Sequence, residues 1–273
     1  MPGEKQTKRW LIEPDTKVDL GKFDPRDLGG APGDQQKTEA ATAELLGKIE
    51  HLQERLWAEN KQALLVVLQA MDAGGKDGTV KKVFEGVNPQ GCRVAAFKEP
   101  TPVELAHDFL WRVHQVVPKH GEITIFNRSH YEDVLIVRVH DIVPKKVWKE
   151  RYALIRDFER NLTESGTTVV KFFLHISKDE QADRFRKRLE NPAKQWKFRS
   201  GDLTERKLWD DYQAAYGDAI GRTSTDNAPW YLVPADHKWF RDWVVSTVLV
   251  QTLERMNPQF PVPEEDLTKV VIE

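Results

Sequence analysis

Short apolar runs alternate with amphipathic stretches along most of the chain. The runs are mostly continuous, as expected for strands buried on both faces of a sheet: ALLVVLQA (63–70), CRVAAF (92–97), EITIFN (122–127), TVVKFFLHIS (168–177) and WYLVPA (230–235). Helical periodicity marks residues 37–60, where Leu45, Ile49, Leu52 and Leu56 form one apolar stripe, and also residues 101–118 and 145–166. This alternation predicts an α/β fold, a three-layer sandwich with a central five-stranded parallel sheet.

The first 35 residues differ from the rest of the chain. They contain Pro14, Pro25, Pro32 and several glycines and show no sustained periodicity. We expect residues 1–35 to form an extended arm that wraps on the body or is partly mobile. Residues 36–273 then form a single domain.

Composition limits the class of protein. The 41 basic and 43 acidic residues nearly balance, so no overall field favours nucleic acid or a membrane. Cys92 is the only cysteine, which excludes a disulfide framework and fits a reducing cytosol; we read it as a small buried hydrophobe. No apolar stretch approaches the roughly 20 residues of a membrane span. The start MPGEKQTKRW lacks the apolar core of a signal peptide, and we expect a soluble cytoplasmic protein.

A glycine-rich segment, MDAGGKDGTVKK (71–82), follows the first predicted strand. A phosphate-binding loop reads G-x-x-x-x-G-K-[ST], and Gly75 and Lys76 fit it, whereas Ala70 and Asp77 do not. The strand–turn–helix context nevertheless favours phosphate binding. Asp72 beside phosphates makes sense with a metal ion between them or with a protonated acceptor to orient. A turn-forming Asp is the simpler interpretation of Asp77, and Thr79 could supply the missing hydroxyl.

The strand at 122–127 also ends in polar residues. Arg128 and Asn127 are placed to meet phosphate at the same edge of the sheet as the glycine loop. Glu132 and Asp133 follow, and Asp133 is our candidate Mg²⁺ ligand. The alternative is that both are first-turn acids favoured by a helix dipole.

The segment 184–199 carries the sharpest charge asymmetry. It contains seven basic residues and the single acid Glu190, and Asn191–Pro192 breaks its helix. Such a run is usually a solvated face, but solvated faces mix signs. We therefore predict a polyanion-binding helical lid at about 178–215, as in a P-loop kinase.

Four segments of the chain resemble motifs of a known family. The segments MDAGGKDGTVKKVFEGVNPQGCRV, FNRSHYEDVLIVRV, FFLHISKDEQ and NPAKQWKFRSGDL are similar to motifs of the polyphosphate kinase 2 family, and the similarity runs from about residue 10 to KVVIE. In that family the phosphate loop is spelt Asp-Ala-Gly-Gly-Lys-Asp-Gly, which accounts for the departures at Ala70 and Asp77. The resemblance implies a P-loop kinase fold, dependence on Mg²⁺, reversible phosphoryl transfer from inorganic polyphosphate to nucleotides, and a homo-oligomer, either a dimer or a tetramer.

The resemblance also assigns residues. Asp72, Lys76, Arg128, Asp133 and Arg188 are the expected catalytic residues, with Asp72 and Asp133 as metal ligands. The expected phosphate- and nucleotide-binding residues are Ala73, Gly74, Gly75, Lys76, Asp77, Gly78, Thr79, Asn127 and Glu132. The expected polyphosphate-binding residues are Lys81, Arg184, Lys187, Arg188, Lys194, Lys197 and Arg199. Many relatives carry Asp where this chain has Asn127. Asn127 together with the segment SHYEDVL makes the chain most similar to the third class of the family, which phosphorylates both nucleoside monophosphates and diphosphates.

Two other functions fit parts of the pattern. An ATP-dependent nucleoside monophosphate kinase would share the fold and the phosphate chemistry, and the identity of the donor separates it from the first hypothesis. A nucleic-acid-binding protein would use the same basic segment with Trp196 and Phe198 as stacking groups. Carboxylates at Asp72 and Asp133 count against it, because a binding module gains nothing from negative charge beside phosphates.

Overall fold

The computed structural model describes residues 7–267, 270 and 272. A six-stranded sheet has the order β1-β6-β5-β2-β4-β3. Its parallel part consists of β2 (Ala63–Gln69), β3 (Cys92–Ala95), β4 (Ile123–Asn127), β5 (Thr167–His175) and β6 (Trp230–Pro234). All five predicted strands are therefore present and parallel.

The sixth strand, β1 (Leu11–Ile12), was not predicted. It lies at the sheet edge and pairs antiparallel with β6, with Leu11 opposite Tyr231. It belongs to the segment expected to be an arm, where Trp10, Ile12, Val18 and Leu20 are buried against the body. The short helix η1 (Leu20–Lys22) follows. The division of the chain into an arm and one domain remains a prediction.

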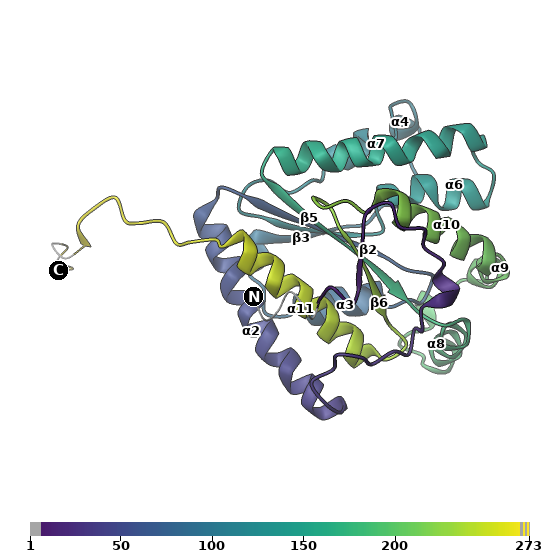
Figure 1. Cartoon of the computed structure of the whole chain (residues 1–273), viewed down its shortest axis with the longest axis horizontal. Coiled ribbons are helices and arrows are strands. Elements are labelled where there is room, and N and C mark those ends of the chain that lie inside the picture. The colour runs from purple at the N-terminus through teal and green to yellow at the C-terminus, as the bar shows by residue number, and fades with distance from the viewer. Residues whose placement is uncertain (1–6, 268–269, 271, 273) are drawn as a thin grey trace.

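Helices cover both faces of the sheet (Figure 1). One face carries α2 (Gln35–Glu59), α3 (Lys76–Val83) and α11 (Lys238–Met256), and the other carries α7 (Lys145–Glu164) and α10 (Trp209–Thr223). Asp34 caps α2 by accepting a hydrogen bond from Lys37 N, and Asn60 ends the helix in the left-handed conformation. The predicted stripe is confirmed, because Ile49 and Leu56 are fully buried.

The prediction of one helix over 101–118 is wrong. The segment forms two short helices, α4 (Pro102–Leu105) and α5 (Trp111–His114), and His107 lies outside both. The side chain of Asp108 accepts a hydrogen bond from Leu110 N at 2.9 Å. This local bond favours a turn over a continuous helix.

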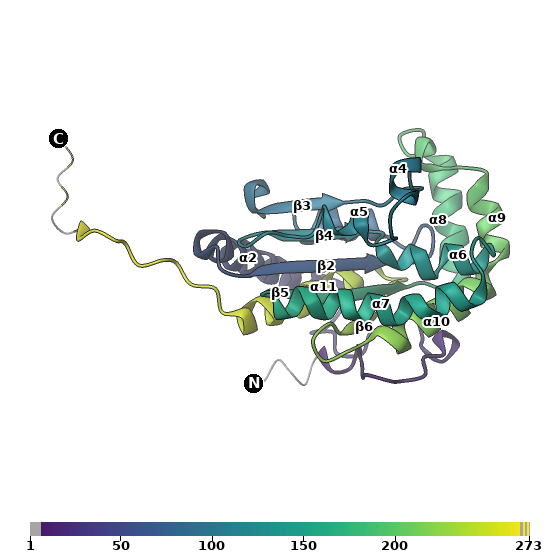
Figure 2. The ribbon, with the colours of Figure 1, turned by 90° about the horizontal axis from the view of Figure 1, so that it is seen from above.

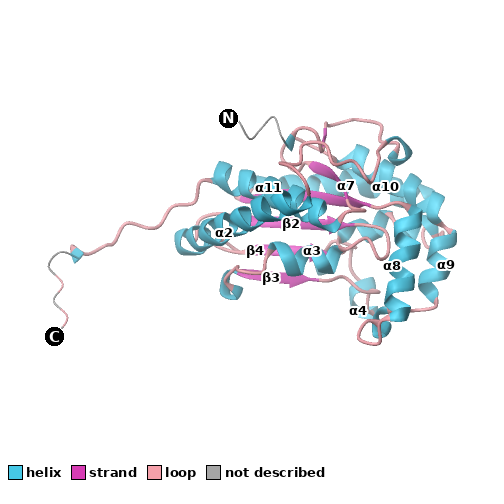
Figure 3. Cartoon of the chain, turned by 90° about the horizontal axis from the view of Figure 1, so that it is seen from below, coloured by secondary structure: helices cyan, strands magenta, loops and turns pink. Residues whose placement is uncertain are grey.

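A helical hairpin stands beyond the carboxyl ends of the strands (Figures 2 and 3). It consists of α8 (Lys178–Glu190), η4 (Gln195–Lys197) and α9 (Gly201–Lys207), and α8 stops before Asn191–Pro192 as expected. We call α8, η4 and α9 the lid. Short helices η2 (Pro89–Gly91), η3 (His130–Val134) and α6 (Ile136–Val139) complete the described elements.

The strand order places β2 in the centre, between β4 and β5. The chain passes from β2 to β3 on one side, and later from β4 to β5 on the other. Parallel sheets bind ligands at the carboxyl edge where the winding direction reverses in this way. Within the described part of the chain, no helix is long and apolar enough to cross a membrane.

Candidate active site

The glycine loop joins the end of β2 to the start of α3. Ala73 has φ 60° and Gly75 has φ 105°, so two residues of this turn are in the left-handed region. A Cβ on Gly74 would lie 2.4 Å from the Cβ of Ala70, which shows how tightly the chain folds back. The turn leads directly into the first residues of α3, whose amide N–H groups can bind an anion.

Lys76 is the first residue of α3, and its side chain folds over the loop. Its Nζ donates a hydrogen bond to the carbonyl of Ala70 at 2.9 Å. Desolvation lowers the pKa of Lys76, and the nearby carboxylate of Asp72 opposes that shift. The ammonium is thus held at the mouth of the loop, where it can contact phosphate.

The end of β4 meets the loop, as the sequence predicted. Nη2 of Arg128 lies 3.4 Å from Oδ1 of Asp72, and Asn127 donates a hydrogen bond to Asp77 at 2.8 Å. Arg128 has φ 68°, which is unfavourable for a residue other than glycine and costs about 1–3 kcal/mol. Strain of this kind persists only where the surrounding contacts hold the backbone, and it is common at functional sites.

The neighbouring acids Glu132 and Asp133 lie in different surroundings. Glu132 accepts from Gln69 at 3.4 Å; burial raises its pKa, while Arg128 and Lys76 oppose this shift. Glu132 therefore shares the environment of the glycine loop.

Asp133 instead lies among arginines. Its Oδ1 lies 3.2 Å from Nη1 of Arg151 and its Oδ2 lies 3.8 Å from Nη2 of Arg112. Burial raises the pKa of Asp133 to about 6, although Arg151 and Arg112 oppose the rise. A metal ion at this carboxylate would have to compete with two cations, and its role as a ligand remains a prediction.

The lid touches the loop through Lys197. Its Nζ donates to Oδ2 of Asp77 at 3.1 Å. Burial would raise the pKa of Asp77, but the hydrogen bonds from Asn127 and Lys197 outweigh it and the pKa is lowered. Asp77 thus connects the loop, the end of β4 and the lid, which is more than the turn-forming role we expected.

Arg188 lies on the inner part of the lid. Its Nη1 is 3.8 Å from Oδ2 of Asp202, and its guanidinium carbon is 5.5 Å from the centre of the Phe185 ring. Burial and, after it, the carboxylate of Asp72 raise the pKa of Asp202, so Asp202 and the Arg188 beside it lie on the side of the lid that faces Asp72. The other predicted polyphosphate contacts on the lid and α3 are exposed: Lys81, Lys187, Lys194 and Arg199.

Arg184, also a predicted polyphosphate contact, is buried behind the loop. Its Nη1 donates to the carbonyl of Ala73 at 3.0 Å, and its Nη2 donates to the carbonyl of Ala235 at 2.5 Å. Arg241 of α11 lies beside it, because a Cβ on Gly75 would be 2.2 Å from Nη1 of Arg241 and 3.3 Å from Nη1 of Arg184. The two guanidinium groups support the back of the loop.

Several residues of this site were not predicted from the sequence. Gln69 contacts Ser129 and Glu132, Asp202 lies beside Arg188, and Arg241 packs against the loop from α11. Only Gln69 carried a signal, because a polar residue at the end of an apolar strand has no place in the core unless it has a partner.

Three further polar side chains are accounted for by their surroundings. His130 is fully buried with its Nε2 3.3 Å from Glu159, so it is a structural histidine. Burial raises the pKa of Cys92 to about 11, which keeps the thiol protonated and unreactive. The hydroxyl of Thr79 donates to the carbonyl of Gly75 at 3.2 Å.

Mg²⁺ fits this site chemically. No cluster of three or more potential metal-ligating side chains occurs among the described residues. Mg²⁺ does not require one, because in phosphate sites it uses one or two carboxylates and the substrate's own oxygens. Asp72 offers a partly exposed carboxylate between Lys76 and Arg128 and suits that arrangement.

Comparisons with known proteins agree with this geometry. Residues 33–261 match the family model Polyphosphate kinase 2. The AMP/ADP-polyphosphate phosphotransferase of Meiothermus ruber is 57% identical over 97% of this chain and 100% of its own length. The ADP-polyphosphate phosphotransferase of Rhodopseudomonas palustris is 44% identical over 94% of this chain and 92% of its own. The crystal structure of polyphosphate kinase 2 from Arthrobacter aurescens TC1 superposes with a TM-score of 0.93 at 42% identity, covering 96% of this chain and 94% of that one.

Proposed function

The chain belongs to the polyphosphate kinase 2 family, and we propose that it transfers the terminal phosphoryl group of inorganic polyphosphate, reversibly and with Mg²⁺, to AMP and ADP. The observation that carries the proposal is the meeting of the loop, the end of β4 and the basic lid at Asp77. The name of the Meiothermus ruber relative supports both acceptors, as does Asn127.

In this reaction an oxygen of the nucleotide's terminal phosphate attacks the terminal phosphorus of polyphosphate. The bond from that phosphorus to its bridging oxygen breaks, and the shortened chain leaves with the electron pair. Because the acceptor is an ionised phosphate, no proton must be removed. Catalysis then depends on holding the two substrates in line and neutralising their charge.

Each group of residues has a part in that task. The loop amides and Lys76 bind the transferring phosphate, while Arg128 and Arg188 stabilise charge that spreads in the transition state. Asp72 would hold Mg²⁺, which neutralises charge between phosphates when bound, and Asp133 is retained as the second proposed ligand. The exposed lid cations bind phosphates remote from the reacting one, and the closed lid excludes water that would hydrolyse the donor.

The decisive experiment mixes the protein, Mg²⁺ and long-chain polyphosphate with AMP or ADP in separate reactions. We expect ATP from ADP only when polyphosphate and Mg²⁺ are both present, and from AMP we expect ADP first and then ATP. Accumulation of ADP without ATP, with polyphosphate in excess, would restrict the acceptor to AMP. Phosphorylation of AMP by ATP without polyphosphate at a comparable rate would favour an ordinary nucleoside monophosphate kinase.

Association and location are further parts of the proposal. We expect a homo-oligomer, a dimer or a tetramer, and a cytoplasmic protein that binds neither nucleic acid nor membranes. Light scattering on the purified chain measures its oligomeric state. Titration with single-stranded nucleic acid tests whether the protein is a nucleic-acid-binding protein instead.

A further inference from the structure

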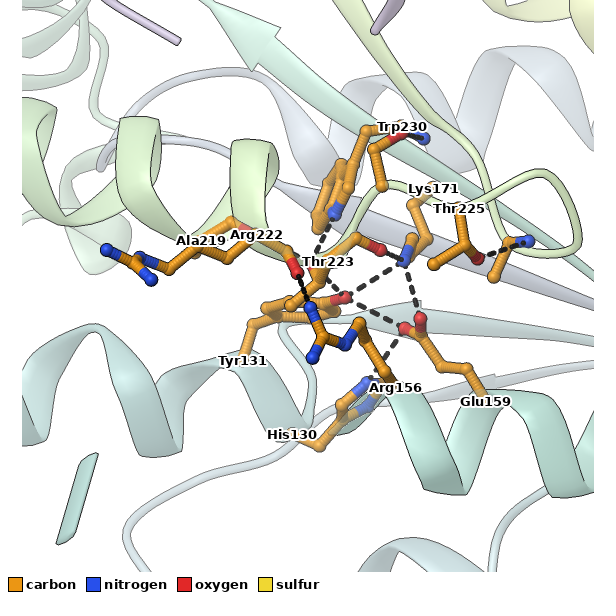
Figure 4. Close-up of polar contacts among 12 residues, drawn as sticks. His130, Tyr131, Arg156, Glu159, Lys171, Ala219, Arg222, Thr223, Thr225 and Trp230 are labelled. Carbon is orange, nitrogen blue, oxygen red and sulfur yellow. Dashed lines mark hydrogen bonds and ion pairs between the residues drawn. The ribbon is translucent and has the colours of Figure 1, made fainter. Parts of the chain in front are cut away.

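A charged lysine lies in the middle of the sheet. Lys171 is on β5, between β2 and β6, and its side chain is fully buried. Its Nζ is 2.5 Å from Oε2 of Glu159, 2.7 Å from the carbonyl of Thr223 and 3.0 Å from the hydroxyl of Tyr131 (Figure 4). These contacts match the three protons of an ammonium group.

Glu159 of α7 completes the network. Its Oε1 lies 2.9 Å from the hydroxyl of Tyr131 and 3.3 Å from Nε2 of His130. The Tyr131 hydroxyl is also 2.8 Å from Oγ1 of Thr223. The network thus joins β5, α7 and the end of α10 to η3 (Figure 4).

Stability alone does not account for this arrangement. Removing two charges from water is costly, and well-packed apolar residues of similar volume often serve a fold equally well. A buried ion pair does fix geometry, because each group must be satisfied in one arrangement. We therefore expect the pair to hold a particular part of the molecule in place.

The pair holds the segment that carries two groups of the active site. His130 and Tyr131 lie between Arg128 and Glu132 in the chain. Before them, β4 fixes Asn127 opposite Leu68. Arg128 keeps a left-handed backbone between these two anchors, a conformation that its own side chain does not favour.

We propose that the buried Lys171–Glu159 pair, acting through Tyr131 and His130, is a positioning device that holds Arg128 and Glu132 at the phosphate site. The inference rests on the proposed function, since the reaction positioned is phosphoryl transfer. All four side chains are buried, which keeps them from direct contact with substrate. Their effect is on the placement of the groups that do.

The principal test is Tyr131→Phe, which removes the hydroxyl that joins the pair to η3 but keeps the ring. We expect kcat to fall about 10-fold, as misplacement of a catalytic group does, while KM for polyphosphate changes less than about 3-fold. Hydrogen exchange of a peptide spanning residues 127–135 should become faster. The control is Tyr231→Phe, which removes a hydroxyl from a buried tyrosine on β6.

A double-variant cycle distinguishes positioning from general weakening. If Tyr131 acts through Arg128, adding Tyr131→Phe to the Arg128→Ala variant should lower kcat very little further. Full additivity with Arg128→Ala, or unchanged kcat in Tyr131→Phe, would overturn the proposal. An inactive wild-type protein in the same assay would instead overturn the proposed function.

The charges are tested separately. Lys171→Met leaves the buried Glu159 carboxylate without its lysine partner and is expected to fold poorly. The informative variant is therefore the double change Lys171→Met with Glu159→Gln, which removes both charges. We expect this protein to fold with cooperative thermal unfolding and to show lower kcat and faster exchange over residues 127–135. Wild-type kcat in the folded double variant would show that the charges do not position the site.

Discussion

Nζ of Lys197 lies 3.1 Å from Oδ2 of Asp77, and this ion pair connects the lid to the glycine loop. The same carboxylate accepts from Asn127. If polyphosphate binds between the lid and the loop as we propose, it would compete with Asp77 for this lid cation. We therefore expect the lid contacts to depend on chain length and on salt.

We predict that Lys197→Ala and Lys194→Ala raise KM for polyphosphate about 10-fold and leave kcat within about 3-fold, because we assign these two lysines to binding the donor chain and not to stabilising the transferring group. The rise should be larger for long chains and smaller at high salt, where screening already weakens the contact. Steady-state kinetics with two chain lengths measure it. Lys119→Ala, a change of an exposed lysine at the opposite end of the sheet, is the control. A fall in kcat without a change in KM would contradict this assignment.

Arg188 should behave differently. A guanidinium presents a planar set of donors matched to phosphate oxygens, which Arg188→Lys removes while the charge stays. We expect kcat to fall about 10- to 100-fold with KM for polyphosphate within a few-fold. Arg186→Lys is the matched control, since Arg186 lies on the same helix, exposed and paired with Asp183. A pure KM effect at Arg188 would make it an ordinary polyphosphate contact.

Lys76→Ala should lower kcat/KM by about 10²-fold or more, roughly 3 kcal/mol of transition-state stabilisation. The variant should keep its thermal unfolding midpoint within a few degrees, because within residues 7–267 the hydrogen bond that Nζ of Lys76 makes is to the carbonyl of Ala70. Near-normal turnover would exclude Lys76 from the reaction.

Gly75→Ala should inactivate the enzyme. Gly75 has φ 105°, and an added Cβ would lie 2.2 Å from Nη1 of Arg241. Arg241 is buried and paired with Asp242, so the loop must move instead. Gly47→Ala in α2 is the control, where a Cβ meets nothing within 4 Å and activity should persist. Activity retained by Gly75→Ala would show that the loop geometry is not required.

The raised pKa of Asp133 predicts how the free energy of unfolding depends on pH. Burial raises its pKa from 3.8 to about 6 in the folded protein, so between these values the folded state holds a proton that the unfolded chain has released. Its contribution to the free energy of unfolding therefore falls as pH rises from about 4 to 6, by at most about 1.4 kcal/mol per pH unit. The difference in unfolding free energy between wild type and Asp133→Asn, measured in urea across that range, should fall accordingly.

The control for this prediction is Asp157→Asn, a change of an exposed residue on α7. The same Asp133→Asn protein tests metal binding. If Asp133 is a Mg²⁺ ligand, the Mg²⁺ concentration for half-maximal activity should rise; an unchanged Mg²⁺ requirement would leave Asp133 as the partner of Arg151 and Arg112. A pH-independent difference in stability would contradict the raised pKa.

The parallel strands were predictable because their signal is local. A strand buried on both faces is mostly apolar, and β2 is fully buried along its length. The edge strand β3 differs, because Arg93 and Val94 are exposed. By contrast, β1 has two residues and exists because β6 pairs with it across more than two hundred positions. The sequence around Leu11 has no pattern that predicts this pairing.

The site was predictable to the level of segments but not of side-chain directions. The loop and the end of β4 were expected to meet, and they do. Glu132 and Asp133, however, are adjacent in the sequence and lie in different environments. They belong to the 3₁₀ helix η3, which follows the left-handed residue Arg128, and this geometry points their side chains in different directions. Likewise the sequence cannot show that Arg184 turns toward loop carbonyls while Arg186 and Lys187, two other cations of α8, are exposed.

The strand order also sets when the enzyme can become active during folding. β5, a neighbour of β2, begins about a hundred residues after it, and β1 must wait for β6, more than two hundred residues further along the chain. Contacts between such distant residues must overcome a large loop-closure entropy, and sheets of this kind fold slowly. A nascent chain that has completed the glycine loop still lacks both the strand and the lid that surround it. We therefore expect catalytic activity to be a late event in folding, because it requires β5 and the lid as well as the glycine loop.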